Sequence, residues 1–397
     1  MIERNQYLEK LISFKDKKLI KVITGIRRCG KSTLLKIFQD YLLKNNIKKN
    51  QIISINFENP DFEDLKDYKS LYKYIEKHLL KDKKNYVFLD EIQNVKDYQK
   101  AVDGLYIKEN VDLYITGSNA YFLSGELATL LSGRYVEIEM LPLSFKEYLS
   151  ALPEKTNLPE KYKNYLVKSS FPYTLELEDE NQIRTYLDGI YNSVILKDVI
   201  ARKNISDVNV LESVVKYMFD NIGNITSVKK ISDALTSAGR KISNHTVENY
   251  LSALTDSFIL YKAGRYDVKG KQYLQTNEKY YLVDIGLRYF LLGSKKADMG
   301  RILENIIYLE LLRRGYEVYI GKVGTLEVDF VAVKNGDVEY YQVAQTVMHP
   351  ETLKRELKPL DSIKDHNPKC LLTLDNEPYS SHKGIKQIYA LDWLLKV

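Results

Sequence analysis

The sequence predicts an α/β protein whose first third is a parallel sheet wrapped by helices. Short apolar segments alternate there with amphipathic helical segments, which is the pattern of such a sheet. A glycine-rich turn also separates the first apolar segment from the helix that follows it. The expected helix spans residues 31–43, and the expected strands are 18–24, 51–57, 86–90, 111–116 and 135–138. Pro142 ends this pattern.

Three further regions are expected after this first domain, which we place at residues 1–143. Residues 144–204 read as a helical connecting region with apolar faces at helical spacing. Residues 205–294 give the order helix, helix, helix and then two extended segments, which is the layout of a winged helix-turn-helix. Residues 295–397 begin with a helix and continue with three strands, so a small α/β domain should close the chain.

Composition excludes several classes of protein. A chain of 397 residues with 44% hydrophobic content can build two or three cores and is neither disordered nor fibrous. It has no apolar run long enough to cross a membrane and no signal-peptide plan at its start, so we expect a cytoplasmic protein. Two distant cysteines, Cys29 and Cys370, give no support for a disulfide framework. The net charge of +6 suits a polyanionic partner. The sequence is also rich in Lys, Asn, Ile and Tyr, a bias typical of an A/T-rich genome, so the charge alone does not indicate nucleic acid.

The glycine-rich turn carries the strongest chemical signal in the sequence. Residues 25–32 match the pattern G-x-x-x-x-G-K-[ST], follow a strand and open a helix, which is the context that a phosphate-binding loop requires. In such a loop, backbone N–H groups and the positive end of the helix dipole hold phosphate oxygens. We expect Lys31 to pair with the β- and γ-phosphates and Ser32 to ligate Mg²⁺. The alternative is a glycine-rich turn without a ligand. The expected nucleotide-binding residues are Gly25, Arg28, Cys29, Gly30, Lys31, Ser32, Thr33 and Asp90.

Two carboxylates at the end of the third strand complete the expected site. Asp90 is placed to hold the water shell of the magnesium ion, together with Ser32. Glu91 follows it and is the natural general base for an attacking water. The alternative for Glu91 is an exposed carboxylate with no such role. The fourth strand ends at residues 116–119, so Ser118 or Asn119 should emerge beside the γ-phosphate.

These motifs resemble the AAA+ ATPases, which combine such a loop, an Asp-Glu pair, a polar residue after strand four and an arginine before strand five. Arg134 stands at the last of these positions. The resemblance implies ATP as the nucleotide and a homo-oligomer in which Arg134 reaches the site of a neighbouring subunit. The alternative is that Arg134 pairs with a local carboxylate. The expected catalytic residues are Glu91, Asn119 and Arg134.

The expected winged helix carries a weaker functional signal. Its third helix, at 243–254, should expose His245, Asn249 and Ser252, and short polar side chains of this kind can read the major groove of double-stranded DNA. Residues 264–273 would form the wing and add cations for phosphates. The inward-facing residues should be Val247, Tyr250, Leu251 and Leu254. Winged helices also serve as protein-docking or ATPase lid domains, so a partner protein remains the alternative.

The last domain resembles the PD-(D/E)XK nuclease fold. Glu304, Asp329 and Gln342 map onto the first three positions of that fold's site, where oxygen ligands would suit Mg²⁺ or Mn²⁺. Ala344 stands where the catalytic lysine of the fold should be. Lys354 or Arg355 on the following helix could replace that lysine. The alternative is a degenerate module kept for packing, for protein contact or for passive binding of nucleic acid.

Taken together, the motifs resemble a prokaryotic family of AAA-like ATPases whose C-terminal half is a domain of unknown function. Three functions follow as hypotheses. The first is an ATPase whose hydrolysis of ATP drives action on DNA through the winged helix. The second is a nucleotide-dependent switch that binds a partner protein, for example in signalling or defence. The third is an ATP-regulated nuclease.

Overall fold

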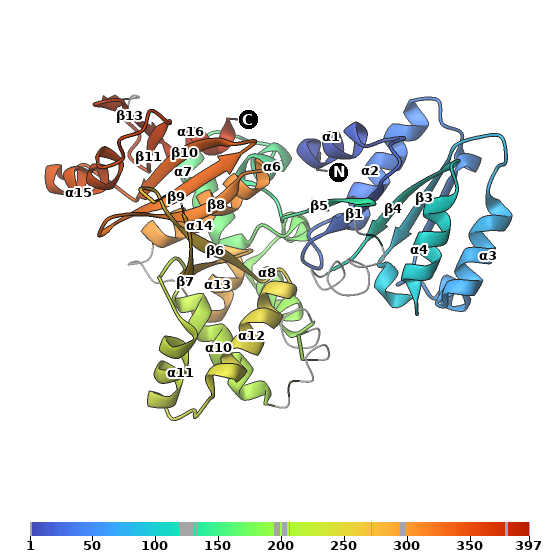
Figure 1. The fold of residues 1–397 in the computed structure, drawn as a ribbon, viewed down its shortest axis with the longest axis horizontal. Coiled ribbons are helices and arrows are strands. Elements are labelled where there is room, and N and C mark those ends of the chain that lie inside the picture. The colour runs from blue at the N-terminus through green and yellow to red at the C-terminus, as the bar shows by residue number, and fades with distance from the viewer. Residues whose placement is uncertain are drawn as a thin grey trace. The chain divides into compact units, whose positions relative to one another are not determined.

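The computed structural model describes residues 2–118, 131, 133–193, 199–200, 205, 207–270, 272–293, 299–377 and 380–396. The chain divides into two compact units (Figure 1). The first comprises Met1–Pro142 with Asp256–Phe258, and the second comprises Leu143–Thr255 with Ile259–Val397. Each unit is described by itself below.

The first unit contains a five-stranded parallel sheet in the order β2-β3-β4-β1-β5. Strands β1, β3 and β4 are buried at every residue because helices cover both faces of the sheet, as in other parallel sheets. The α/β prediction is therefore confirmed. The strands are β1 (Ile20–Thr24), β2 (Ile52–Asn56), β3 (Asn85–Asp90), β4 (Val111–Thr116) and β5 (Tyr135–Glu139). The helices are α1 (Asn5–Ser13), α2 (Lys31–Lys44), α3 (Tyr68–His78) and α4 (Tyr98–Ile107).

The two faces of this sheet have different cores. On one face, α3 and α4 pack on the apolar side chains of the strands, with Leu71 and Leu105 completely buried. On the other face, Phe38 of α2 lies against the rings of Phe88 and Tyr114, with ring centroids 6.1 and 5.0 Å away. Alternate side chains of a strand point to opposite faces, so one apolar strand serves both cores.

A buried ion pair joins two strands of this sheet. Lys21 of β1 contacts Asp112 of β4, and their side chains are 0% and 1% exposed. The Tyr114 hydroxyl and the Asp16 N–H donate to the same Asp112 carboxylate at 2.8 and 2.9 Å. Burial lowers the pKa of Lys21, and the Asp112 charge opposes this shift. A buried charge of this kind is tolerated only because it is fully paired.

The second unit is built on an eight-stranded mixed sheet in the order β12-β13-β11-β10-β9-β8-β6-β7. The β6–β7 hairpin, which includes the segment expected as a wing, joins the C-terminal strands because β6 pairs in parallel with β8. The sheet therefore continues across the boundary expected at residue 294. Its strands are β6 (Leu260–Asp267), β7 (Gln272–Leu282), β8 (Glu317–Val323), β9 (Leu326–Lys334), β10 (Asp337–Ala344), β11 (Lys369–Thr373), β12 (Ser380–His382) and β13 (Ile385–Tyr389).

Helices of the second unit come in three groups. Those of the expected connecting region are α6 (Phe145–Ala151), α7 (Leu158–Lys168) and α8 (Glu180–Ile190). Before the hairpin come α10 (Val208–Asp220), α11 (Val228–Ser237) and α12 (Asn244–Asp256). The remaining ones are α13 (Ile285–Leu292), α14 (Met299–Arg313), α15 (Pro350–Asp361) and α16 (Ala390–Leu395). Within the parts of the chain that the structure describes, no helix has the length and apolar character needed to cross a membrane.

Helix α12 has the faces that its sequence predicts. His245, Asn249 and Ser252 are exposed. The four residues expected to face inward are all buried: Val247, Tyr250, Leu251 and Leu254. Three helices followed by a hairpin is also the order expected for residues 205–294.

Candidate nucleotide site

The loop between β1 and α2 depends on glycine at two positions. Gly25 has φ +138°, and a Cβ atom there would lie 2.2 Å from the carbonyl oxygen of Met140. Gly30 has φ +107° and forms the N-cap of α2. Both angles lie in the region that only glycine adopts readily. Arg28, between them, also has a positive φ of +67°. The loop therefore turns sharply at the N-terminus of a helix, as a phosphate-binding loop must.

Arg4 anchors this loop to the end of β5, and the sequence analysis missed it. Its guanidinium is buried and donates to the carbonyl oxygen of Cys29 at 3.0 Å and to that of Leu141 at 2.6 Å. A single arginine far from the motif carries no local signal, so only the fold reveals this role. Cys29 itself is a free, buried cysteine, and burial raises the pKa of its thiol.

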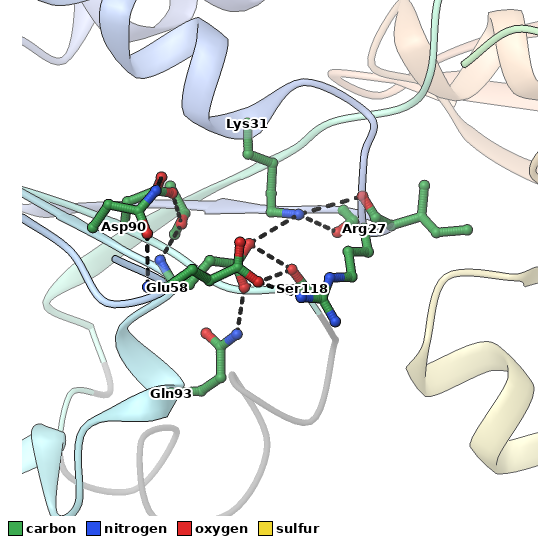
Figure 2. A network of polar contacts seen from close by, with 11 residues as sticks. Arg27, Lys31, Glu58, Asp90, Gln93 and Ser118 are labelled. Atoms are coloured by element: carbon green, nitrogen blue, oxygen red, sulfur yellow. Dashed lines mark hydrogen bonds and ion pairs between the residues drawn. The ribbon is translucent and has the colours of Figure 1, made fainter. Parts of the chain in front are cut away.

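Lys31 points back over the loop. Its Nζ donates to the carbonyl oxygens of Gly25 at 3.0 Å and Ile26 at 3.3 Å, and it lies 3.6 Å from Glu91 Oε1 (Figure 2). These close acceptors are neutral, and phosphate oxygens would be stronger partners for an ammonium group. Ser32 and Thr33 follow in the first turn of α2, and Ser32 hydrogen-bonds the Asp90 carboxylate.

Asp90 is held by side chains from the ends of both neighbouring strands. Thr116 Oγ1 of β4 donates to Asp90 Oδ1 at 2.6 Å, and Asn56 Nδ2 of β2 donates to Oδ2 at 2.9 Å. Burial raises the pKa of Asp90, while hydrogen bonds from Thr116 and Ser32 oppose that rise. The sequence analysis gave no role to Asn56 or Thr116. Their position at the carboxyl ends of parallel strands was the available signal.

Glu91 is buried and oriented, not an exposed carboxylate. Ser118 Oγ lies 2.7 and 2.8 Å from its two carboxylate oxygens, and Gln93 donates to Oε2 (Figure 2). Burial would raise the pKa of Glu91, but the Lys31 charge and the bonds from Ser118 and Gln93 outweigh it and lower that pKa. Glu91 also has φ +55°, an uncommon conformation that clusters at functional sites. The carboxylate is therefore ionised and fixed beside the loop.

The structure says less about the other two expected catalytic residues. Asn119 lies outside the described residues. Arg134 Nη1 bonds Asp103 Oδ1 at 2.6 Å, and its guanidinium lies 5.5 Å from the centroid of the Tyr106 ring. This contact is the local pairing that the sequence left open as an alternative.

The residues expected to hold Mg²⁺ lie together and fit a nucleotide-bound ion. Asp90 and Ser32 are hydrogen-bonded to each other at the end of β3 and the start of α2. Magnesium in nucleotide sites usually takes one or two protein ligands and completes its shell with phosphates and water.

The expected nuclease residues also lie together, in the second unit. Asp329 N–H donates to Gln342 Oε1 at 3.4 Å, and Asp329 Oδ2 accepts from the Val343 N–H at 2.8 Å. Lys279 of β7 contacts Glu304 and lies near Asp329. Lys279 is thus a cation of this cluster that the sequence did not point to. Arg355 is 74% exposed and pairs with Glu356, whose other carboxylate oxygen accepts from Gln342 at 2.9 Å, so its role in place of the lysine stays a prediction.

Comparison with known proteins agrees with this site. A family model described as "AAA domain" matches residues 17–149. An uncharacterized protein of Haemophilus influenzae is 44% identical over 400 residues, which cover 100% of this chain and 99% of that protein. The chain belongs to this family of prokaryotic AAA-type P-loop ATPases. An uncharacterized protein of Methanocaldococcus jannaschii is 34% identical over 382 residues, covering 90% of this chain and 80% of that protein.

Two further matches extend past the AAA domain of this ATPase. A model described as "Domain of unknown function (DUF8612)" matches residues 159–298. A solved structure, the Walker-type ATPase of Pyrococcus abyssi, covers 73% of this chain and 96% of its own length, with a TM-score of 0.51 and 14% identity. That likeness shows a shared fold. The match to the AAA-domain model, in contrast, makes the chain an ATP-binding protein of the AAA type.

Proposed function

We propose that this protein hydrolyses ATP with Mg²⁺ and that Glu91 is the general base. The observation that carries the proposal is a buried Glu91 whose carboxylate is held by Ser118 at 2.7 and 2.8 Å and lies 3.6 Å from Lys31. In the proposed step, a water oxygen bonds to the γ-phosphorus while Glu91 accepts its proton. The bond from that phosphorus to the bridging oxygen breaks, which leaves ADP and phosphate.

The other side chains of the site take supporting roles in this proposal. Lys31 exchanges the carbonyl oxygens of Gly25 and Ile26 for β- and γ-phosphate oxygens. Ser32 and Asp90 hold the magnesium ion, which neutralises developing charge on the phosphates when bound. Ser118 keeps the Glu91 carboxylate aimed at the loop. We place this activity in the cytoplasm, where ATP is present and the two free cysteines would stay reduced.

Arg134 is proposed to act on the site of a neighbouring copy. Tyr135 pairs with Ile20, the first residue of β1, whereas the phosphate loop follows Thr24, the last residue of that strand. Arg134 therefore lies at the opposite end of the strands from the phosphate loop. The distance along the strand is about 15 Å, which exceeds the reach of an arginine side chain. A mixture of Lys31→Ala and Arg134→Ala proteins tests the idea: recovered ATP hydrolysis supports a shared site, and no recovery refutes it.

We further propose that ATP hydrolysis is coupled to a target bound by α10–α12 and the β6–β7 hairpin. The element order favours a winged helix and hence double-stranded DNA. The surface of α12 instead favours the second candidate, a nucleotide-dependent switch that binds a partner protein. That helix has no lysine or arginine, and its Glu248 lines a groove of about 690 Å³ together with Glu278 and Lys262, which pair with each other. A helix without cations offers no charged partner to DNA phosphates, which favours a protein segment as the occupant of this groove.

Steady-state ATP hydrolysis tests both levels of the proposal. Wild type, Glu91→Gln and the control Glu76→Gln, an exposed glutamate on α3, are each assayed with and without double-stranded DNA at two salt concentrations. Hydrolysis lost only in Glu91→Gln, with ATP binding kept, supports the assigned base. Salt-sensitive stimulation by DNA supports the DNA-coupled ATPase. Hydrolysis indifferent to DNA favours the protein-binding switch, and full activity in Glu91→Gln refutes the proposed mechanism.

A further inference from the structure

A buried lysine lies among three carboxylates in the second unit, well away in sequence from the nucleotide site. Lys279 Nζ is 2.9 Å from Glu304 Oε1, 2.8 Å from Glu327 Oε1 and 4.0 Å from Asp329 Oδ1. The Tyr281 hydroxyl donates to Glu304 Oε1 at 2.7 Å. Strand β7, helix α14 and strand β9 thus meet at one charge cluster, defined here as the Lys279 cluster: Lys279, Glu304, Glu327 and Asp329.

The carboxylates of this cluster need a cation at this place. Glu304 and Asp329 have side chains only 11% and 12% exposed, so water screens their mutual repulsion poorly. Burial and the Glu304 charge together raise the pKa of Asp329, and the Lys279 charge opposes that rise. For Lys279, burial favours the neutral amine, but the three carboxylates outweigh it and raise its pKa. The contacts at 2.9 and 2.8 Å pair its ammonium group with Glu304 and Glu327.

Part of the cluster is also covered. The side chain of Lys279 is 5% exposed. Gly223 packs over Glu304, since a Cβ atom there would lie 3.3 Å from Glu304 Oε2, and its N–H donates to the carbonyl oxygen of Tyr280 on β7 at 3.1 Å. A phosphodiester needs an open approach to such carboxylates and to any metal between them. Among the described residues, Gly223 and Lys279 restrict that approach at Glu304, whereas Glu327 is 32% exposed.

We propose that Lys279 is a built-in counter-ion that takes the place of a divalent cation. The acids that resemble a nuclease's metal ligands are then satisfied within the chain, and the C-terminal α/β part neither requires a metal ion nor cleaves nucleic acid. The same contacts tie the β6–β7 hairpin to α14 and β9. Lys279 of β7 supplies a positive charge near these acids, whereas Ala344, at the expected position of the catalytic lysine, supplies none.

Thermal unfolding of the full chain without nucleotide, in EDTA and in millimolar MnCl₂, tests this proposal. Wild type should melt at the same temperature in both solutions. Lys279→Met leaves the carboxylates without a cation, so in EDTA its transition should fall by about 10 °C. Manganese should restore part of that loss because it can now occupy the cluster. The matched control is Lys262→Met, which removes a lysine side chain that is 52% exposed on the adjacent strand β6. Its melting temperature should match that of wild type in EDTA and in MnCl₂.

Two results would overturn the proposal. One is a manganese-induced rise in the melting temperature of wild type that Asp329→Asn abolishes, because the native chain would then hold a metal. The other is a Lys279→Met protein whose loss manganese does not restore. If Lys279→Met does not fold, Lys279→Met/Glu327→Gln takes its place, with less charge to neutralise. The wild-type comparison stands in either case, and it is independent of ATP hydrolysis.

Discussion

Lys31 and Lys279 are both buried and both lie near carboxylates, yet we propose that only Lys31 binds a ligand. Lys31 donates to two neutral carbonyl oxygens and lies 3.6 Å from the nearest carboxylate oxygen, that of Glu91. Lys279 lies within 2.9 Å of two carboxylates. A phosphate can displace neutral acceptors, but it cannot compete with two charged ones that are already in place. On these proposals, the same residue types build a ligand site in one unit and an ion cluster without a metal in the other.

The surrounding backbone explains the difference. Lys31 begins a helix after a glycine-rich loop, where backbone N–H groups and the helix dipole also attract an anion. Lys279 lies within a strand, whose N–H and C=O groups are used in pairing with β6. Lys31 is therefore next to backbone donors that can bind an anion, whereas the groups around Lys279 are carboxylate acceptors that need a cation.

The largest expected effect comes from removing Lys31, the lysine that we propose to bind phosphate. Lys31→Ala should lower kcat/KM for ATP by about 1,000-fold, because it removes a cation that contacts the transferring phosphate. The stability of the protein without ATP should change little. Steady-state kinetics and thermal unfolding measure the two effects, and Lys36→Ala, an exposed lysine on the same helix, is the control. A stability loss comparable to that of Lys279→Met would erase the distinction between the two lysines.

A second test asks whether saturated ion pairs are structural in the first unit as well. Asp112→Asn should lower the free energy of unfolding by about 3 kcal/mol, because it leaves Lys21 buried without its partner. Urea unfolding measures this loss. Glu63→Gln, which breaks an exposed pair with Lys66, should cost less than about 1 kcal/mol. Equal costs for the two variants would show that the buried pair has no special role.

A third test compares two hydroxyl groups that each bond a glutamate. Tyr281→Phe should lower stability by about 2 kcal/mol, since a hydrogen bond to a charged, buried Glu304 is lost. It should leave ATP hydrolysis unchanged. Ser118→Ala should lower kcat about 10-fold, because Glu91 loses the bonds that orient it. An effect of Ser118→Ala on melting temperature alone would argue against its role in orienting Glu91.

The smallest expected effects are on the pH dependence of stability, where Glu91 and Asp90 should contribute with opposite signs. The pKa of Glu91 is lowered from its ordinary 4.5, so ionised Glu91 stabilises the fold above that pH, and this contribution disappears as pH falls through the lower folded value. The pKa of Asp90 is raised from 3.8, so its ionisation costs stability as pH rises through the folded value. Without nucleotide near neutral pH, Glu91→Gln should destabilise and Asp90→Asn should stabilise the protein. Urea unfolding between pH 4 and 7 measures both, and shifts of the same sign would contradict this assignment.

Much of the first unit could be predicted from the sequence because its signals are local. The Gly25–Ser32 loop combines glycine conformations, a helix start and a lysine within eight consecutive residues. Asp90 and Glu91 follow directly from the end of an apolar strand. These residues are close together in sequence or directly follow a strand, so their arrangement is nearly the same in any P-loop domain. Arg4 shows the limit, since it contacts Leu141 across 137 positions of sequence.

The C-terminal part shows where sequence reasoning stops. Glu304, Asp329 and Gln342 match the expected positions, and Ala344 stands where a lysine is expected. The cations near in sequence are Lys354 and Arg355, whereas Lys279 comes from β7, whose partner β6 pairs with β8 in the same sheet. The phosphate loop can be predicted from residues 25–32 because local backbone geometry dictates it. Which carboxylates already have a cation cannot be predicted in this way, because that depends on contacts between strands distant in the chain.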